Sequence, residues 1–293
     1  MRGGVTNAVR LTAAARRGVH KTAAAQVACA HQRRHRRRDG DGGAVAAGPV
    51  IGPGHPAWAL LQQPLLQVTR QMEMLNVFLG FEQANRYALV DGEGRAVGFM
   101  AEEQSLAATL GRQLYRTHRP FRVHVLDAAG KPCLEIRRGF SLINSRITVS
   151  DAAGVVVGES QQEWHPWRRR YNLFTPGGSS SGSGSRSGFD QFARVDAPFL
   201  SWDFPLADAH GAALGGVFRG FAGISTELLT DYGLYSLCLS RTALAQRADV
   251  GQPCGLPLAG REMDADERAV ALAAAVSIDF DYFSRHSRLG GGI

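Results

Sequence analysis

The pattern of apolar positions changes near residue 80. Between residues 65 and 79, apolar side chains recur at the spacing of a helix, at Leu65, Val68, Met72, Leu75 and Leu79. This spacing predicts an amphipathic helix that packs on the edge of the domain. Beyond it, short apolar runs are separated by turn residues. Such runs predict strands, so we expect most of the remaining chain to form a β-sheet.

A D-x-x-G segment recurs four times among these strand-like runs, at residues 91–94, 127–130, 151–154 and 208–211. The Asp side chain can bond the backbone ahead of it, and Gly can adopt positive φ. Each segment therefore predicts a hairpin turn, often with a bulge. Four such turns predict an antiparallel sheet in which consecutive strands are neighbours.

Residues 267–279 (ERAVALAAAVSID) have helical propensity and are apolar all round. A helix that spans a membrane needs about 20 apolar residues, and Arg268 and Asp279 bracket a shorter segment. A helix with small side chains and no polar face is instead suited to a narrow space enclosed by protein, such as the interior of a barrel. Asp279 is the last residue of this segment and Asp281 follows Phe280. We expect the two to end the helix and to pair with Arg285 rather than to bind metal.

Positive charge is concentrated at the start of the chain. Residues 1–38 contain ten Lys and Arg residues and no acid, so subtracting these charges from the formal net charge of +7 leaves about −3 for the rest. The folded part is therefore not basic, which argues against nucleic-acid binding by that part. An Arg-rich and Ala-rich leader without acids is typical of a mitochondrial transit peptide, with a disordered basic arm as the alternative.

The composition also predicts the boundaries of the domain. Residues 39–63 are rich in Gly, Ala and Pro and predict a flexible linker, so that the folded domain would occupy residues 64–290. Within it, the Gly/Ser-rich residues 176–188 predict a disordered loop between two strands. The cysteines lack metal-site spacing and predict reduced thiols; they are Cys29, Cys133, Cys238 and Cys254.

Several motifs in order resemble the phospholipid scramblase family, over about residues 65–288. They include LNVFLGFE at 75–82, QEWHP at 162–166, the pair Asp203 and Phe204, and IDF at 278–280. The run WRRRYNLF at 167–174 and the ending IDFDYFSRHS at 278–287 are similar to those of the mitochondrial, fungal-type branch. This resemblance implies a tubby-like fold, which is a closed antiparallel barrel of about twelve strands around a hydrophobic C-terminal α-helix.

The resemblance implies ATP-independent, bidirectional translocation of phospholipids or lipid binding at a membrane. The expected location is a mitochondrial membrane, with the plasma membrane as the alternative. The chain departs from the vertebrate plasma-membrane members at two places. The cysteine cluster before R-P-F is missing at residues 106–118. Only Asp231 matches their proposed calcium segment, so calcium is a poorly supported cofactor and no other cofactor is expected.

The run QQEWHPWRRRYNLF at 161–174 carries the candidate site. Pro166 interrupts a strand, and alternation then puts Trp167, Arg169 and Tyr171 on one face and Arg168 and Arg170 on the other. Trp and Tyr favour the headgroup level of a membrane, and Arg offers paired donors to phosphate. The candidate lipid-contact residues are Trp164, Trp167, Arg168, Arg169, Arg170 and Tyr171. The alternative is ordinary barrel architecture.

Arg168 and Arg170 are the first candidates for anionic headgroups such as cardiolipin. His165 is expected to bond the backbone in a turn rather than to act as a base, because no nucleophile and orienting acid accompany it in the sequence.

Three hypotheses remain: a lipid translocator, a peripheral anionic-lipid-binding scaffold without translocase activity, and an enzyme. The enzyme is disfavoured because no catalytic constellation can be assembled from the sequence.

Overall fold

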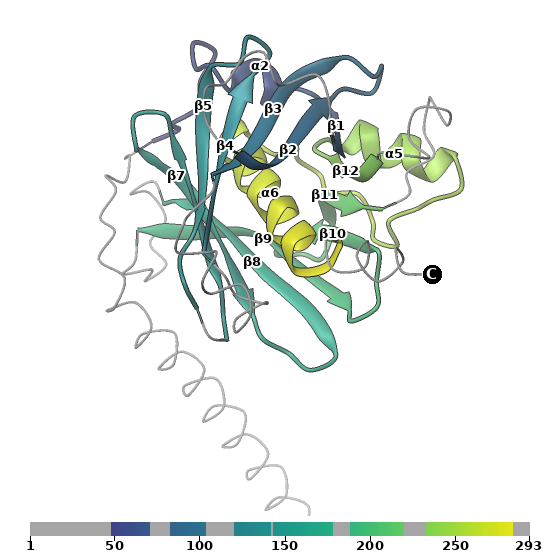
Figure 1. Cartoon of the computed structure of the whole chain (residues 1–293). Helices are drawn as coiled ribbons and strands as arrows, with labels where there is room; N and C mark the ends of the chain where they lie inside the picture. Colours follow the sequence, from purple (N-terminus) through teal and green to yellow (C-terminus); the bar gives the residue numbers. More distant parts are fainter. Residues whose placement is uncertain are drawn as a thin grey trace, which may run out of the picture. The chain divides into compact units, whose positions relative to one another are not determined.

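The computed structural model describes residues 48–70, 83–103, 120–141, 143–177, 188–219 and 233–283, all of which belong to one compact unit, residues 43–293. Its strands form a closed antiparallel barrel in the order β1-β12-β11-β10-β9-β8-β7-β6-β5-β4-β3-β2 (Figure 1). The mainly β, twelve-stranded barrel implied by the family resemblance is confirmed.

The strands are β1 (Leu65–Arg70), β2 (Gln83–Val90), β3 (Ala96–Glu103), β4 (Phe121–Asp127), β5 (Pro132–Arg138), β6 (Arg146–Asp151), β7 (Val156–Glu163), β8 (Arg168–Pro176), β9 (Phe189–Pro198), β10 (Asp203–Ala207), β11 (Ala213–Phe218) and β12 (Gly233–Cys238). The helices are α2 (Trp58–Leu61), α5 (Arg241–Asp249), α6 (Ala265–Ile278) and the π-helix η1 (Asp279–Phe283).

All four D-x-x-G segments form the predicted hairpin turns, between β2 and β3, β4 and β5, β6 and β7, and β10 and β11. In the third turn, the Asp151 carboxylate accepts the backbone N–H groups of Ala153 and Val155 at 2.9 and 2.8 Å. Gly154 has φ +85°, a conformation that Gly adopts without strain. Beside each of these turns the strand register shifts, as expected for a bulge.

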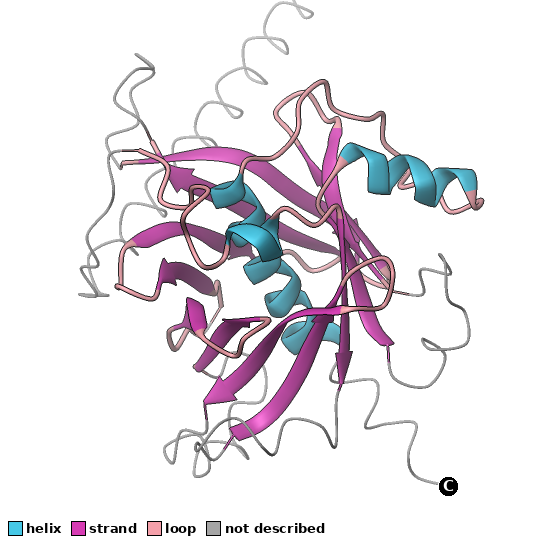
Figure 2. Cartoon of the chain, turned by 90° about the horizontal axis from the view of Figure 1, so that it is seen from above, coloured by secondary structure: helices cyan, strands magenta, loops and turns pink. Residues whose placement is uncertain are grey.

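Helix α6 occupies the interior of the barrel, and all fourteen of its residues are buried (Figure 2). The Asp264 side chain accepts the Glu267 backbone N–H, and the Glu267 side chain accepts that of Asp264, which forms a capping box. A Cβ atom at Gly158 on β7 would clash with Val270 and lie 2.5 Å from the Phe174 carbonyl oxygen. Glycine there lets the helix approach the strand, and the prediction of an enclosed C-terminal helix is confirmed.

The helix predicted from residue 65 is wrong where the structure describes it, because Leu65–Arg70 form strand β1. β1 pairs with both β2 and β12 and closes the barrel. Leu66 and Val68 face the interior, whereas Leu65 packs outside with Leu244 of α5. Burial on both faces, rather than helical periodicity, explains the spacing of the apolar positions. The rest of the predicted helix, residues 71–79, lies outside the described residues.

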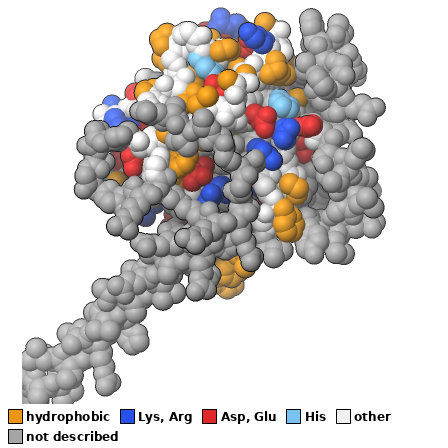
Figure 3. All heavy atoms as spheres, turned by 90° about the vertical axis from the view of Figure 1, so that its left-hand side faces the viewer, with side chains coloured by type: hydrophobic (Ala, Val, Ile, Leu, Met, Phe, Trp, Pro, Cys, Tyr) orange, Lys and Arg blue, Asp and Glu red, His pale blue; other side chains and the backbone are white. Residues whose placement is uncertain are grey.

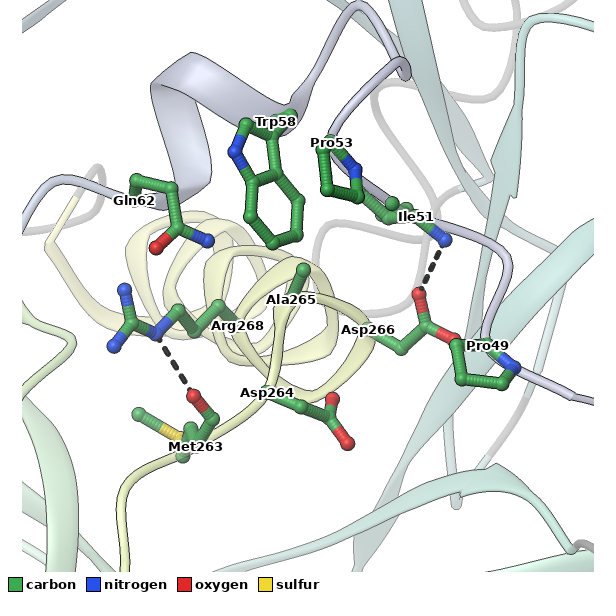
Figure 4. Close-up of a pocket in the computed structure, with 11 residues that line it drawn as sticks. Pro49, Ile51, Pro53, Trp58, Gln62, Met263, Asp264, Ala265, Asp266 and Arg268 are labelled. Carbon is green, nitrogen blue, oxygen red and sulfur yellow. Dashed lines mark hydrogen bonds between the residues drawn. The ribbon is translucent and has the colours of Figure 1, made fainter.

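The predicted flexible linker also differs from the structure over its second half. Ile51, Leu60 and Leu61 belong to the main hydrophobic core. The Asp266 carboxylate accepts the backbone N–H groups of Val50 and Ile51, both at 2.8 Å. Figure 4 shows this segment and α2 covering the N-terminal end of α6. The Gly and Pro content of residues 39–63 therefore led to the prediction of a linker for a segment that in fact closes one end of the barrel.

Charged side chains of both signs lie next to one another on the face of the barrel in Figure 3. Ion pairs of the outer wall include Arg122, which lies 3.3 Å from Glu103 and 3.2 Å from Glu135. Such exposed pairs are typical of a solvated surface and contribute little to stability.

Candidate functional site

The predicted site begins in the turn between β7 and β8, residues 164–167. Trp164 and Trp167 are exposed over 62% and 76% of their surface. His165 accepts the Trp167 backbone N–H through Nδ1 at 3.2 Å, which confirms its expected role in the turn. The apolar surface of these two indole rings remains in solvent and is available for burial against an apolar partner.

Arg168 and Arg170 lie on the same face of β8, as predicted, and share one carboxylate. Arg168 donates to the Asp196 carboxylate through Nε and to the Asp196 carbonyl oxygen through Nη2, and Arg170 Nε donates to the carboxylate at 3.3 Å. Arg170 also lies 3.6 Å from Glu163. Partial burial alone would raise the pKa of Asp196, but the hydrogen bond and charge of Arg168, then of Arg170, hold that pKa below its usual value.

The opposite face of β8 enters the barrel. Arg169 stacks on the Phe199 ring, with 4.1 Å from Cζ to the ring centroid. Tyr171 is 1% exposed and lies in the main core, so its assignment as a lipid contact is wrong. Trp167 lies in the turn before β8, whereas Tyr171 lies within the strand on its inward face, which explains the difference.

Below this end of the barrel, Tyr171 belongs to a buried polar network around Asp281. Arg138 Nη1 lies 2.8 Å from the Asp281 carboxylate, and the Tyr171 hydroxyl donates to it at 3.1 Å. Ser277 donates at 3.3 Å. Burial, followed by the Asp281 charge, raises the pKa of Tyr171 well above its usual value. The expected partner Arg285 lies outside the described residues, and Arg138 is the partner that the structure shows.

A cavity of about 450 Å³ lies at the opposite end, under α2 (Figure 4). Its lining includes Trp58, Met263 and Arg268. The Arg268 guanidinium donates to the carbonyl oxygens of Met263 and Leu61 at 3.0 and 2.9 Å. These polar groups hold the cover of the barrel onto α6, and their bonds are satisfied within the protein.

The predicted calcium residue Asp231 lies outside the described residues. Among the residues that the structure describes, no group of three or more acidic, His or Cys side chains is arranged to hold a metal ion. Within the same ranges, no helix has the length and apolar character needed to cross a bilayer.

Sequence reasoning missed five further exposed apolar side chains near the tryptophans: Phe140, Ile143, Phe199, Leu200 and Trp202. They lie in the turns between β5 and β6 and between β9 and β10. The sequence did contain a pattern that points to this cluster, because the four D-x-x-G turns occupy one end of the barrel. Because hairpin connections alternate between the two ends, the turns after β5, β7 and β9 must then meet at the other end, where large apolar residues in a turn are unusual.

The fold and site define a β-barrel protein that encloses its C-terminal helix and exposes tryptophans and arginines at one end. Residues 48–285 match the family model described as Scramblase. The chain is 44% identical over 256 residues to "Altered inheritance rate of mitochondria protein 25" of Saccharomyces cerevisiae, covering 80% of this chain and 75% of that protein. A phospholipid scramblase family protein of Schizosaccharomyces pombe is 41% identical over 256 residues, or 83% and 65% of the two chains.

Phospholipid scramblase 1 of Mus musculus is 30% identical over 240 residues, which are 77% of this chain and 63% of the mouse protein. The chain therefore spans somewhat less than two thirds of the second and third of these relatives. No solved structure matches it significantly. The chain belongs to the scramblase family.

Proposed function

We propose that this protein acts on membrane phospholipids as a scramblase-like translocator that needs no ATP, at a mitochondrial membrane. The family membership supports the substrate class, and the name of the Saccharomyces cerevisiae relative supports the location. The observation that carries the proposal is the exposure of Trp164 and Trp167 beside Arg168 and Arg170. Indole rings favour the headgroup level of a bilayer, and guanidinium groups bind phosphate.

Anionic lipid, with cardiolipin as the candidate, is the finer part of the proposal. Arg168 and Arg170 share Asp196, and Arg170 lies near Glu163, so these side chains carry no net charge as a group. The pairs are 32–54% exposed, so a headgroup phosphate can replace either carboxylate as the guanidinium's partner. We therefore expect the arginines to contribute lipid preference and the tryptophans to contribute most of the affinity.

A peripheral lipid-binding scaffold is the second candidate, and one observation favours it. Helix α6 fills the barrel and all its residues are buried, so a headgroup has no route through the barrel interior as it stands. A translocator built in this way would have to act by perturbing the bilayer at its surface. A scaffold would need surface binding only.

Reconstitution of the full chain tests both candidates. Liposomes with a fluorescent phospholipid are treated with an impermeant quencher, and the same vesicles are floated on a density gradient. A translocator floats and makes inner-leaflet lipid accessible, whereas a scaffold floats without doing so. A chain that neither floats nor exposes the inner leaflet contradicts the proposal.

The lipid preference has its own control. Arg168→Gln/Arg170→Gln should weaken flotation with cardiolipin-containing vesicles by roughly thirtyfold, from about 1 kcal/mol per basic residue. The matched variant Arg95→Gln/Lys131→Gln removes two charges at the D-x-x-G end and should have a much smaller effect. Equal losses from the two variants would show a general charge effect and no headgroup site.

A further inference from the structure

Three of the turns that the structure describes share one end of the barrel, because hairpin connections in an antiparallel barrel alternate between its ends. The D-x-x-G turns lie at the end covered by α2, and the turns after β5, β7 and β9 lie at the other (Figure 1). We call the second group, residues 139–141, 143–145, 164–167 and 199–202, the aromatic end. Strands β5 to β10 are consecutive neighbours, so these turns occupy adjoining positions on the rim.

The aromatic end collects most of the exposed large apolar side chains in the described part of the chain. Nine such side chains are exposed among the described residues, and only Val250 and Leu258 lie elsewhere. The others are Phe140, Ile143, Trp164, Trp167, Phe199, Leu200 and Trp202. Leu200 and Trp167 are the most exposed, at 79% and 76%. Apolar side chains gathered in this way mark an interaction surface, whereas single ones would not.

Hydrogen bonds join the three turns in series. The Trp164 backbone N–H donates to the Asn144 side chain at 2.8 Å, which connects the first turn to the second. The Phe199 N–H donates to the Trp167 carbonyl oxygen at 3.1 Å, which connects the second to the third. One connected rim therefore presents the apolar side chains, and its backbone is held in place before binding.

Arginines are held at the same rim by two of its rings. Arg169 stacks on Phe199 at 4.1 Å, and Arg219 stacks on Trp202 at 4.8 Å. When such a ring enters an apolar phase, the guanidinium stacked on its face stays at the boundary of that phase, beside the polar headgroups. This layering, with apolar tips and arginines beside them, matches acyl chains below phosphates in a bilayer.

We propose that the aromatic end is the surface by which this protein inserts into the interface of a phospholipid bilayer. The inference rests on the proposed function and deepens it by fixing the orientation. The C-terminal end of α6 and the π-helix η1 then face the membrane, because Asp281 is bonded to Arg138 at the end of β5. The α2 cover, with Asp266 and Arg268, faces away from it.

Flotation of the full chain with phosphatidylcholine vesicles tests the insertion, because neutral lipid removes the charge contribution. Trp167→Ser/Leu200→Ser changes the two most exposed tips. We expect at least tenfold weaker vesicle binding and an unchanged melting temperature. Val250→Ser/Leu258→Ser removes exposed apolar area away from the aromatic end and is the matched control, expected to bind like the parent.

Several results would overturn the inference. If the parent binds and the tip variant binds equally well, another face meets the bilayer while the proposed function stands. If both variants lose binding equally, the effect is not specific to the aromatic end. If the tip variant binds vesicles normally but changes the molecular mass in solution, the surface is a protein interface. A parent that binds neither neutral nor anionic vesicles would refute the proposed function itself.

Discussion

Removal of the charge on Asp281 should destabilise the barrel strongly. Asp281 lies in η1 and pairs with Arg138 of β5 at 2.8 Å, and the two side chains are 4% and 1% exposed. Asp281→Asn keeps the size of the side chain but leaves the Arg138 charge buried without its carboxylate. Breaking a buried pair in this way costs about 3 to 5 kcal/mol.

The expected change in thermal stability follows from the size of the domain. For a domain of this size, 1 kcal/mol corresponds to about 2 to 4 °C in melting temperature, so Asp281→Asn should lower it by roughly 6 to 20 °C. Glu135→Gln breaks the partly exposed pair with Arg122 and serves as the control, with a loss below about 1 kcal/mol. Differential scanning calorimetry measures both variants.

A double-mutant cycle separates the pair from its surroundings. Arg138→Gln/Asp281→Asn places two neutral amides where the ions were, and its cost should be smaller than the sum of the two single variants, with a coupling energy of up to about 3 kcal/mol. Additive losses, or an Asp281→Asn melting temperature equal to the parent's, would show that the ion pair does not hold η1 in the barrel.

Three further predictions concern the helix, the thiols and the leader. Ala274 is fully buried, so Ala274→Phe should overpack the barrel and cost about 1 to 3 kcal/mol; an unchanged melting temperature would contradict an enclosed helix. Burial raises the pKa of Cys133 and of Cys238 to about 12, so a maleimide at neutral pH should modify them only after unfolding, and rapid modification of the native protein would contradict their burial. Residues 1–38 should carry a fused reporter into mitochondria, and a diffuse reporter would refute the transit peptide.

Local sequence patterns predicted the parts of the fold that local physics determines. The D-x-x-G turns need only an Asp side chain and a Gly with positive φ, as in Asp151 and Gly154, so four hairpins were visible in the sequence. Helix α6 was visible because no polar face interrupts it. β1 was not, since the burial of Leu65 beneath α5 depends on an element far away in the sequence.

The candidate site was predicted only where neighbouring residues form it. The shared face of Arg168 and Arg170 follows from strand alternation. Tyr171 was misassigned because alternation identifies a face but not its depth in the barrel. The partners Asp196 and Arg138, and the other two turns of the aromatic end, are brought together by the barrel topology alone.

The central claim is that the aromatic end meets the bilayer, and the four tryptophans allow a direct test. Trp58 lies in α2 at the opposite end from Trp167. Two variants, each keeping one of these residues and Phe in place of the other three, are bound to vesicles whose acyl chains carry bromine. Quenching of Trp167 but not of Trp58 is the predicted result. Equal quenching of the two, or quenching of Trp58 alone, would contradict the orientation.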